Sequence, residues 1–313
     1  MTLTQLEYIL AVNKYRHFGK AAKACFVTQP TLSMQVHKLE DEMGILVFDR
    51  SKSPVMPTPE GKAVIDQARV VVRERKRLLD VVQQTKGALS GDFRLAVIPT
   101  LSPYVLPLFV ERFVQAQPDL NLIIEECKTE EIVALLAQDE IDAGLLVTPL
   151  HDDSLTELPL FYEPFYLFVD PDHPLAKKKK IRQEDLDLGE IWLLNKGNCF
   201  RDQVLNICAD DQGSEPGTVR FESGNFETLK NMVLTSSGYT ILPDLAVRQL
   251  SAQRKRLVRP FRQPVPTREI SLVYGRSVLR KRVIDALEEA IVKAIPKELR
   301  AINRRDVEVV EIT

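Results

Sequence analysis

The sequence predicts an α/β protein in two parts, a small helical head and a larger body in which strands and helices alternate. The head, residues 1–87, holds 14 Lys and Arg against 9 Asp and Glu, whereas residues 88–313 hold 28 against 35. A glycine-containing stretch, Lys86-Gly87-Ala88-Leu89-Ser90-Gly91, separates the two parts. A basic head on an acidic body indicates that the head binds a polyanion.

Composition fits an ordinary soluble globular protein, with 44% hydrophobic and 27% charged residues. No basic start precedes an apolar run and no run reaches membrane length, so we expect a cytoplasmic protein with no membrane partner. In that reducing compartment, any disulfide is expected to be transient or redox-sensing. The four cysteines are Cys25, Cys127, Cys199 and Cys208. The scattered histidines show no zinc spacing, and neither a metal nor a cofactor is expected.

Residues 1–58 are predicted to form three helices and two short strands. Apolar residues recur at helical spacing over 3–15, an alanine-rich helix follows at 19–25, and a third helix runs from Thr28 to about Met43. The two strands surround a basic turn whose Arg50 and Lys52 would reach phosphate or the minor groove. The third helix presents side chains suited to the major groove: Thr28, Gln29, Pro30, Thr31, Ser33, Gln35 and Lys38. A plain three-helix bundle with solvated polar faces fits the same residues.

A long helix is predicted over residues 59–87, with Thr58 as its cap. It carries one irregular apolar stripe, and its other faces are heavily charged, as in Arg73-Glu74-Arg75-Lys76-Arg77. Because no domain surrounds this helix, we expect it to pair with a second copy of itself. Such pairing would set two recognition helices against two half-sites.

The body, residues 88–313, is predicted to form two lobes with a ligand cleft between them. A late return of the chain assigns about 88–163 and 269–300 to lobe I and about 164–268 to lobe II, and the charged tail after Lys297 is expected to be mobile. The alternation favours parallel α/β units. Strands are expected at 93–98, 120–126, 141–147, 165–170, 191–194, 218–222, 239–242 and 270–274, and helices near 103–116, 130–138, 199–210, 226–236 and 279–294.

Cys199 and Cys208 lie at opposite ends of the helix expected from residue 199. Asn198 is a good N-cap, and the helix dipole together with Arg201 predicts a lowered Cys199 pKa. Nine residues of helix rise about 13.5 Å, whereas a disulfide needs Cα atoms about 4.4–6.8 Å apart. A bond between these cysteines would therefore require the helix to unwind, as a redox-controlled two-state element. Two unrelated buried thiols are the alternative interpretation.

Two threonines are expected beside Cys199. Thr100 follows the first strand of the body, Thr129 follows the second, and Cys199 follows the strand expected at 191–194. Ligands collect beyond the carboxyl ends of parallel strands, so these three groups converge on one crevice. Each threonine alone is explained more simply as a helix cap, and their convergence is what favours a binding site.

The head carries the motifs of a known family. It resembles the winged helix-turn-helix of LysR-type transcriptional regulators in Phe18-Gly19-Lys20-Ala21-Ala22, Thr28-Gln29-Pro30-Thr31-Leu32-Ser33, Lys38-Leu39-Glu40, Phe48-Asp49-Arg50 and Thr58-Pro59-Glu60-Gly61. The resemblance implies a DNA-binding domain over 1–58 with its recognition helix from Thr28, a dimerising linker helix over 59–87, and a periplasmic-binding-protein-like regulatory domain over 88–313.

The body resembles the hydrogen-peroxide-sensing branch of that family in Ile98-Pro99-Thr100, in 197–203 with Cys208, in 229–233 and in 241–243. The resemblance implies that Cys199 is the peroxidatic cysteine, which forms a sulfenic acid, and that Cys208 resolves it to a disulfide. Known members carry His beside the reactive cysteine, whereas Asn198 can hydrogen-bond but cannot donate a proton as an imidazolium. The implied peroxide-binding residues are Thr100, Thr129, Gln203 and Asn198, with Arg201 and Asp202 in support.

The resemblance also implies a set of partners: double-stranded operator DNA, hydrogen peroxide, RNA polymerase, a glutaredoxin- or thioredoxin-type dithiol reductant, and further copies of the chain in a dimer of dimers, the homotetramer. It implies an activator of oxidative-stress genes and not an enzyme. Two alternatives stay open. One is a LysR-type regulator that answers a small organic effector in the cleft with both cysteines inert. The other is a thiol peroxidase, which would need neither the basic head nor the recognition helix.

Overall fold

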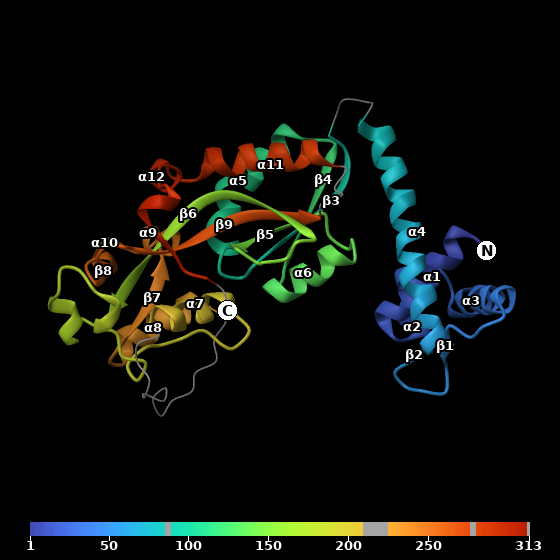
Figure 1. Cartoon of the computed structure of the whole chain (residues 1–313), viewed down its shortest axis with the longest axis horizontal. Coiled ribbons are helices and arrows are strands. Elements are labelled where there is room, and N and C mark those ends of the chain that lie inside the picture. The colour runs from blue at the N-terminus through green and yellow to red at the C-terminus, as the bar shows by residue number, and fades with distance from the viewer. Residues whose placement is uncertain (85–88, 209–224, 276–279, 312–313) are drawn as a thin grey trace. The chain divides into compact units, whose positions relative to one another are not determined.

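The computed structural model describes residues 1–84, 89–208, 225–275 and 280–311 (Figure 1). The chain divides into two compact units, Met1–Gly87 and Ala88–Thr313. The strand expected at 218–222 lies outside the described residues, as do the last residues predicted for the helices at 59–87 and 199–210 and the first one predicted for the helix at 279–294.

The first unit contains the three helices and the wing that the sequence predicts. Thr2, His17 and Thr28 cap its first three helices with their side chains. On α3, apolar residues at i, i+4 and i+7 (Leu32, Val36, Leu39) are fully buried against the other helices. The elements are α1 (Leu3–Tyr15), α2 (Phe18–Ala24), α3 (Gln29–Met43), antiparallel β1 (Phe48–Asp49) and β2 (Met56–Pro57), and α4 (Pro59–Gln84).

The first half of helix α4 contributes to the core of the first unit. The Thr58 hydroxyl accepts the Gly61 N–H at 2.9 Å and so caps the helix. Ile65 and Ala68 are buried in the core that α1 helps to form. Farther along, Val71 and Leu78 are 38% and 66% exposed. Apolar residues of the single stripe are therefore buried at Ile65 and Ala68 and exposed at Val71 and Leu78, a division that the sequence did not predict.

The second unit is built on a mixed sheet in the order β4-β3-β5-β9-β6-β7, with β10 beside β9 and β8 beside β6. Strand β3 is parallel to β4 and β5, whereas β9 is antiparallel to β5 and β6, so the expectation of parallel units holds for one end only. The strands are β3 (Gly91–Val97), β4 (Leu120–Glu126), β5 (Ala143–Thr148), β6 (Leu155–Val169), β7 (Tyr239–Pro243), β8 (Val258–Pro260), β9 (Pro266–Gly275) and β10 (Glu308–Val309).

Strand β6 joins the two ends of this unit. Its residues 155–164 pair with β9, and its residues 165–169 pair with β7. Figure 1 shows β6 and β9 running along the unit side by side. The predicted lobe boundaries fall on these two strands, at Pro164 and near Arg268; the lobe assignment itself remains a prediction. The strand expected at 165–170 is thus far longer. The one expected at 191–194 is reduced to bridge residues at Ile191, which pairs with Tyr239, and at Leu194.

The helices flank the sheet and fill the connections between strands. The α-helices are α5 (Ser102–Ala116), α6 (Thr129–Ala137), α7 (Cys199–Ile207), α8 (Phe226–Thr235), α9 (Asp244–Arg248), α10 (Ala252–Lys255), α11 (Lys281–Ala294) and α12 (Lys297–Arg300). The described part of the unit also contains short 3₁₀ turns, η1 (Pro174–Lys177), η2 (Gln183–Asp185) and η3 (Arg304–Asp306). None of the helices in the described ranges is long and apolar enough to cross a membrane.

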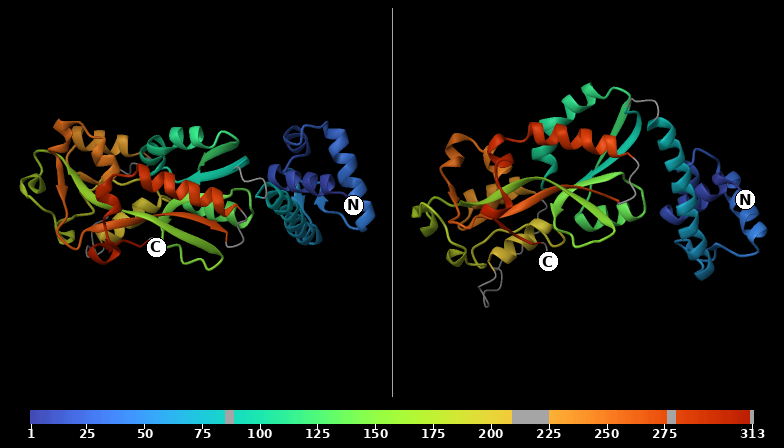
Figure 2. Two further views of the ribbon diagram at one scale, coloured as in Figure 1. Left: turned by 90° about the horizontal axis from the view of Figure 1, so that it is seen from above. Right: turned by 45° about the horizontal axis from the view of Figure 1, so that its top comes forward.

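The tail after Lys297 is ordered into structure, contrary to the expected mobility. It forms α12 and η3 and then adds β10 parallel to β9. Val310 is only 7% exposed, because it packs into the main core. Both views in Figure 2 show the last described residues running back beside α7. The sequence did not predict this strand, because β10 is only two residues long and an alternating pattern cannot be recognised over so few residues in a charged segment.

Candidate functional site

Cys199 opens helix α7, as the sequence predicts. Asn198 is its N-cap, and the Asn198 Oδ1 accepts the Phe200 N–H at 3.1 Å. Gly197 before it has a φ of +77°, and a Cβ there would lie 3.2 Å from the Lys128 Nζ, so glycine suits this turn. The helix ends at Ile207, and Cys208 is its C-cap residue. Both cysteines are buried thiols and are not joined in a disulfide.

Burial raises the pKa of the Cys199 thiol, against the predicted lowering. The Thr129 hydroxyl and the Arg268 guanidinium act in the opposite direction and lower it, while Asp202 and Glu130 raise it further. The sequence argument considered only the helix dipole and Arg201, which would lower the pKa, and missed the larger cost of desolvating a thiolate. Arg201, expected to help lower the pKa, donates from its Nη1 to the Leu194 carbonyl oxygen at 2.8 Å.

Neither Thr100 nor Thr129 is a helix cap, so the simpler explanation for both is wrong. Leu101 takes the N-cap position of α5 and Lys128 that of α6. The Thr100 hydroxyl accepts the Arg268 Nη1–H at 3.2 Å. The Thr129 hydroxyl oxygen is buried and lies close enough to the Cys199 thiol to lower its pKa. It makes no well-aligned hydrogen bond with any of the described residues.

Gln203 lies one helical turn after Cys199 and is completely buried. Residues at i and i+4 share a helix face, so both side chains leave α7 on the same side. The Gln203 Nε2 donates to the Val310 carbonyl oxygen at 2.7 Å. Its Oε1 is buried and has no hydrogen-bond partner within 1–84, 89–208, 225–275 and 280–311.

Arg268 is a buried residue of the candidate site that sequence reasoning missed. It is fully buried on β9 and forms an ion pair with the equally buried Glu163 of β6, at 2.7 Å. The Glu163 Oε1 in turn accepts the Leu245 N–H at 2.8 Å. A single arginine beside a glutamate in the otherwise largely apolar segment 266–275 was the available signal. Buried charges are rare unless paired, and they often mark functional sites.

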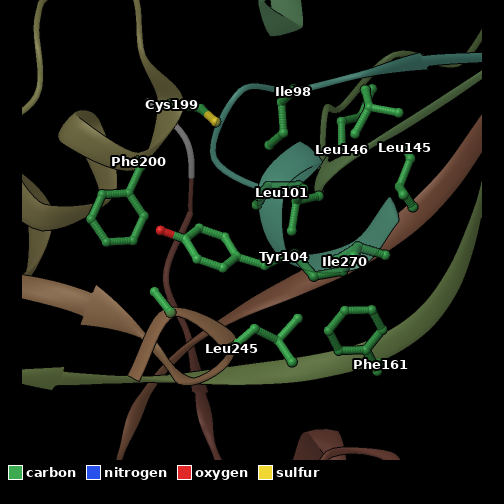
Figure 3. Packing of buried hydrophobic residues seen from close by; sticks show 14 of the residues in the cluster. Ile98, Leu101, Tyr104, Leu145, Leu146, Phe161, Cys199, Phe200, Leu245 and Ile270 are labelled. Atoms are coloured by element: carbon green, nitrogen blue, oxygen red, sulfur yellow. The ribbon is translucent and has the colours of Figure 1, made fainter. Parts of the chain in front are cut away.

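An aromatic cluster holds the start of α7 in place. The Phe200 ring makes edge contacts with Phe165 and Phe226, with ring centroids 5.2 and 4.8 Å apart. The Arg268 guanidinium lies 5.5 Å from the Phe200 ring centre. Figure 3 shows Cys199 and Phe200 opposite the segment that carries Ile98, Leu101 and Tyr104. The Cys199 thiol is therefore placed beside a tightly packed aromatic residue of the same helix.

The remaining candidates around the thiol take supporting positions. Burial raises the pKa of the Asp202 carboxyl, Glu130 raises it further, and Arg201 opposes this shift. Cys127 is partly buried, and burial followed by the neighbouring glutamates raises the pKa of its thiol. Cys25 lies at the end of α2, and burial raises its pKa too. Among the described residues, every group that shifts the pKa of either thiol raises it, which disfavours the nucleophilic thiolate.

The residues predicted to read DNA lie along α3 and at its N-cap. Thr28, Gln29, Pro30, Thr31 and Lys38 are exposed, and Ser33 is partly so. Gln35 is partly exposed, and its Oε1 accepts from the Gln5 Nε2 at 3.2 Å.

The wing is held against α3 by the buried Glu40. One Glu40 oxygen accepts the Val47 N–H at 2.9 Å, and the other accepts the Arg50 Nη2–H at 2.7 Å. The second wing cation, Lys52, is 3.6 Å from Asp49 and largely exposed.

Both units match one family along most of their length. The family model described as the LysR substrate binding domain matches residues 86–295, and that of the bacterial regulatory helix-turn-helix protein, lysR family, matches residues 3–62. The chain is 38% identical over 295 residues to the DNA-binding transcriptional dual regulator OxyR of Escherichia coli, covering 93% of this chain and 95% of that protein.

Solved structures agree with this match. A full-length OxyR variant from Pseudomonas aeruginosa is 37% identical, with a TM-score of 0.75 and coverage of 93% of this chain and 94% of that one. A hydrogen-peroxide-bound OxyR variant from Corynebacterium glutamicum is 26% identical, with a TM-score of 0.63 and coverage of 98% of each chain. The helix-turn-helix unit and the α/β regulatory unit thus occur together, in this order, in proteins of one kind. The chain belongs to the LysR family of bacterial DNA-binding transcription regulators.

Proposed function

We propose that this regulator senses hydrogen peroxide through reversible formation of a Cys199–Cys208 disulfide and thereby controls oxidative-stress genes. Its relatives include proteins named hydrogen peroxide-inducible genes activator, from Dickeya chrysanthemi among others. The family consists of transcription regulators, which leaves the thiol peroxidase alternative without support.

One observation carries the proposal: two buried polar atoms near the Cys199 thiol lack a partner in the described parts of the chain. They are the Thr129 Oγ1 and the Gln203 Oε1. Buried polar groups are nearly always paired, so an orphan marks a place where a small polar molecule belongs. Hydrogen peroxide both donates and accepts hydrogen bonds and is little larger than water, so it can serve a hydroxyl and a carboxamide oxygen together.

Two groups at the site favour the reactive thiolate of Cys199, against the larger effect of burial. The Cys199 thiol must lose its proton to become nucleophilic. Burial opposes that loss, and the Arg268 guanidinium together with the Thr129 hydroxyl favours it. The Thr100 hydroxyl accepts from Arg268, which leaves its own proton available to a peroxide oxygen. We assign the peroxide-binding role to Thr100, Thr129 and Gln203, and the capping role to Asn198.

The chemistry balances with peroxide as the only oxidant. The Cys199 thiolate attacks one peroxide oxygen, the O–O bond breaks, and the departing hydroxide takes a proton to leave as water. Cys199 is then a sulfenic acid. The Cys208 thiol attacks that sulfur, a second water leaves, and the two thiols have given two electrons to the peroxide. A dithiol reductant of the glutaredoxin or thioredoxin type returns these electrons by exchange.

Forming the disulfide must unwind α7. Both cysteines flank an intact helix, whose rise over nine residues is about 13.5 Å, so the sulfurs cannot meet while it persists. Phe200 and Gln203 lie between them and must leave their packing when the helix opens. We propose that this repacking re-spaces the DNA-binding units of a dimer of dimers, which contact operator DNA through α3 and the wing and engage RNA polymerase in the cytoplasm.

The test is a footprint of the protein on its own promoter-region DNA before and after peroxide. The footprint should change on adding peroxide, return with dithiothreitol, and stay fixed in Cys199→Ser. Cys208→Ser should also stay fixed, because its Cys199 stops at the sulfenic acid. A footprint that ignores peroxide in the unsubstituted protein would instead favour a small organic effector as the signal.

A further inference from the structure

The C-terminal segment Val307–Glu311 is bound directly to the sensor helix. The Gln203 Nε2 of α7 donates to the Val310 carbonyl oxygen at 2.7 Å, and the Asn206 Nδ2 donates to the Glu311 carbonyl oxygen at 3.1 Å. Residues 203 and 206 are three apart, so they share one face of the helix. Figures 1 and 2 show this end of the chain lying beside α7.

The other side of the same segment is fixed to the sheet. The Glu308 N–H donates to the Val265 carbonyl oxygen at 3.2 Å, and the Val310 N–H donates to the Thr267 carbonyl oxygen at 2.9 Å. The Val310 side chain is buried in the main core. The segment thus bridges α7 and β9, the strand that carries Arg268.

The Val310 carbonyl decides how Gln203 faces the site. A carbonyl oxygen can only accept, so Gln203 must give it the amide NH₂. The Gln203 Oε1 is thereby directed away from the tail, as the buried acceptor that lacks a partner in the described ranges. Without the tail, the carboxamide could rotate and present a donor or an acceptor equally well.

Both tail contacts require α7 to be helical. An intact helix holds the Cα atoms of Cys199 and Cys208 about 13.5 Å apart. A disulfide between them needs these atoms within about 6.8 Å of each other. Gln203 and Asn206 lie between the two cysteines, so neither can keep its place against Val310 and Glu311. The tail therefore interacts with the reduced form of the sensor and loses these interactions in the oxidised form.

We propose that Val307–Glu311 is a redox-sensitive latch, which positions Gln203 for peroxide in the reduced protein and is released when the disulfide forms. The inference rests on the proposed peroxide sensing. It makes the C-terminal segment part of the sensor, because a contact made only in the reduced state stabilises that state. Removing the latch must then favour the disulfide.

The first test is hydrogen exchange of the full chain, read by mass spectrometry on peptides that cover residues 307–311. The main-chain amides there should exchange at least tenfold faster after peroxide oxidation than in the reduced protein. Cys208→Ser treated with peroxide should keep the slow exchange, because it forms no disulfide. Unchanged exchange in a protein whose disulfide has formed overturns the latch, whereas failure to form the disulfide overturns the proposed function instead.

The second test measures the disulfide equilibrium in dithiol redox buffers. Asn206→Ala should shift it about threefold toward the disulfide, because one latch contact is lost. A chain ending at Asp306 should shift it about tenfold, or about 30 mV to more negative potential, and should react more slowly with peroxide. The matched control is Gln183→Ala, which removes a 2.8 Å bond to the Glu308 carboxylate but no contact with α7. Equal potentials in Asn206→Ala, Gln183→Ala and the unsubstituted protein overturn the proposal.

Discussion

Two buried polar clusters in the second unit differ in one respect that separates structure from function. In the closed cluster, the Thr148 hydroxyl lies 2.8 Å from the Glu269 Oε1 and 2.5 Å from the Ser271 Oγ, and the Tyr162 hydroxyl donates to the Glu269 Oε2 at 2.7 Å. In the sensor cluster, Thr129 and Gln203 each keep a buried oxygen with no partner in the described parts of the chain.

The difference teaches where this fold keeps room for a ligand. The closed cluster ties β5, β6 and β9 together, and a satisfied buried network makes a core rigid. The sensor cluster lies where α6, α7 and the tail meet. Its unpaired buried oxygens cost free energy when no ligand is bound. Substitutions in the first should therefore lower stability, and substitutions in the second should lower peroxide reactivity.

The largest effect is expected at the two cysteines of the sensor cluster. Cys199→Ser should abolish oxidation by one equivalent of peroxide, because serine is not oxidised. Cys208→Ser should abolish the disulfide but still allow a sulfenic acid at Cys199, measurable by a dimedone-type trap and intact mass. Cys127→Ser is the control and should respond like the unsubstituted protein. A trapped sulfenic acid on Cys127 would break the assignment.

Arg268 contributes to both stability and reactivity. Arg268→Met should cost about 3–5 kcal/mol in unfolding free energy, because it leaves the buried Glu163 carboxylate unpaired. Adding Glu163→Leu should restore most of that stability, as measured by urea unfolding. The double variant should still react slowly with peroxide, since the guanidinium that favours the thiolate is gone. Full recovery of the rate would show that Arg268 acts on folding alone.

Thr148→Val tests the closed cluster. It removes the hydroxyl that lies between Glu269 and Ser271 and leaves their buried oxygens short of a partner. The unfolding free energy should fall by about 1–3 kcal/mol. The rate of peroxide oxidation should not change, as followed by the fluorescence of the single Trp192. A slower rate of peroxide oxidation would show that the closed cluster also contributes to the peroxide reaction, and would contradict the distinction between the two clusters.

Thr129→Val is the matched change in the sensor cluster and should barely alter stability. Its hydroxyl approaches the Cys199 thiol but has no well-aligned hydrogen-bond partner in the described residues, so the unfolding free energy should move by no more than about 0.5 kcal/mol. The peroxide rate at neutral pH should fall about tenfold. Because Thr129 lowers the pKa of the Cys199 thiol, its loss raises that pKa, and the pH of half-maximal rate should move upward. A normal rate with lost stability would assign Thr129 to the fold.

Local chemistry explains what the sequence could predict. The cap at Asn198, the buried stripe of α3 and the strand Leu120–Glu126 depend on neighbours within a few residues, and the structure confirms all three. The approach of Thr129 to Cys199 was also predicted, although only Thr129 follows a strand of the sheet, β4, and the strand expected before Cys199 did not form.

Long-range burial explains the features that the sequence could not predict. The direction of the Cys199 pKa depends on how completely other elements cover the thiol, and no local pattern carries that information. Arg268 meets Glu163 and Thr100 across 105 and 168 residues of chain. The tail strand is two residues long, and its partner Gln203 lies 107 residues earlier. Each of these features is set by packing between distant segments.

The most direct measurement is a non-reducing tryptic map after about one equivalent of hydrogen peroxide. Cleavage after Lys196, Arg201 and Arg220 separates the two cysteines into peptides 197–201 and 202–220. The account predicts that these two peptides become joined by a disulfide and part again with dithiothreitol. Finding both cysteines free after peroxide, or Cys199 bonded to Cys127 in place of Cys208, would contradict it.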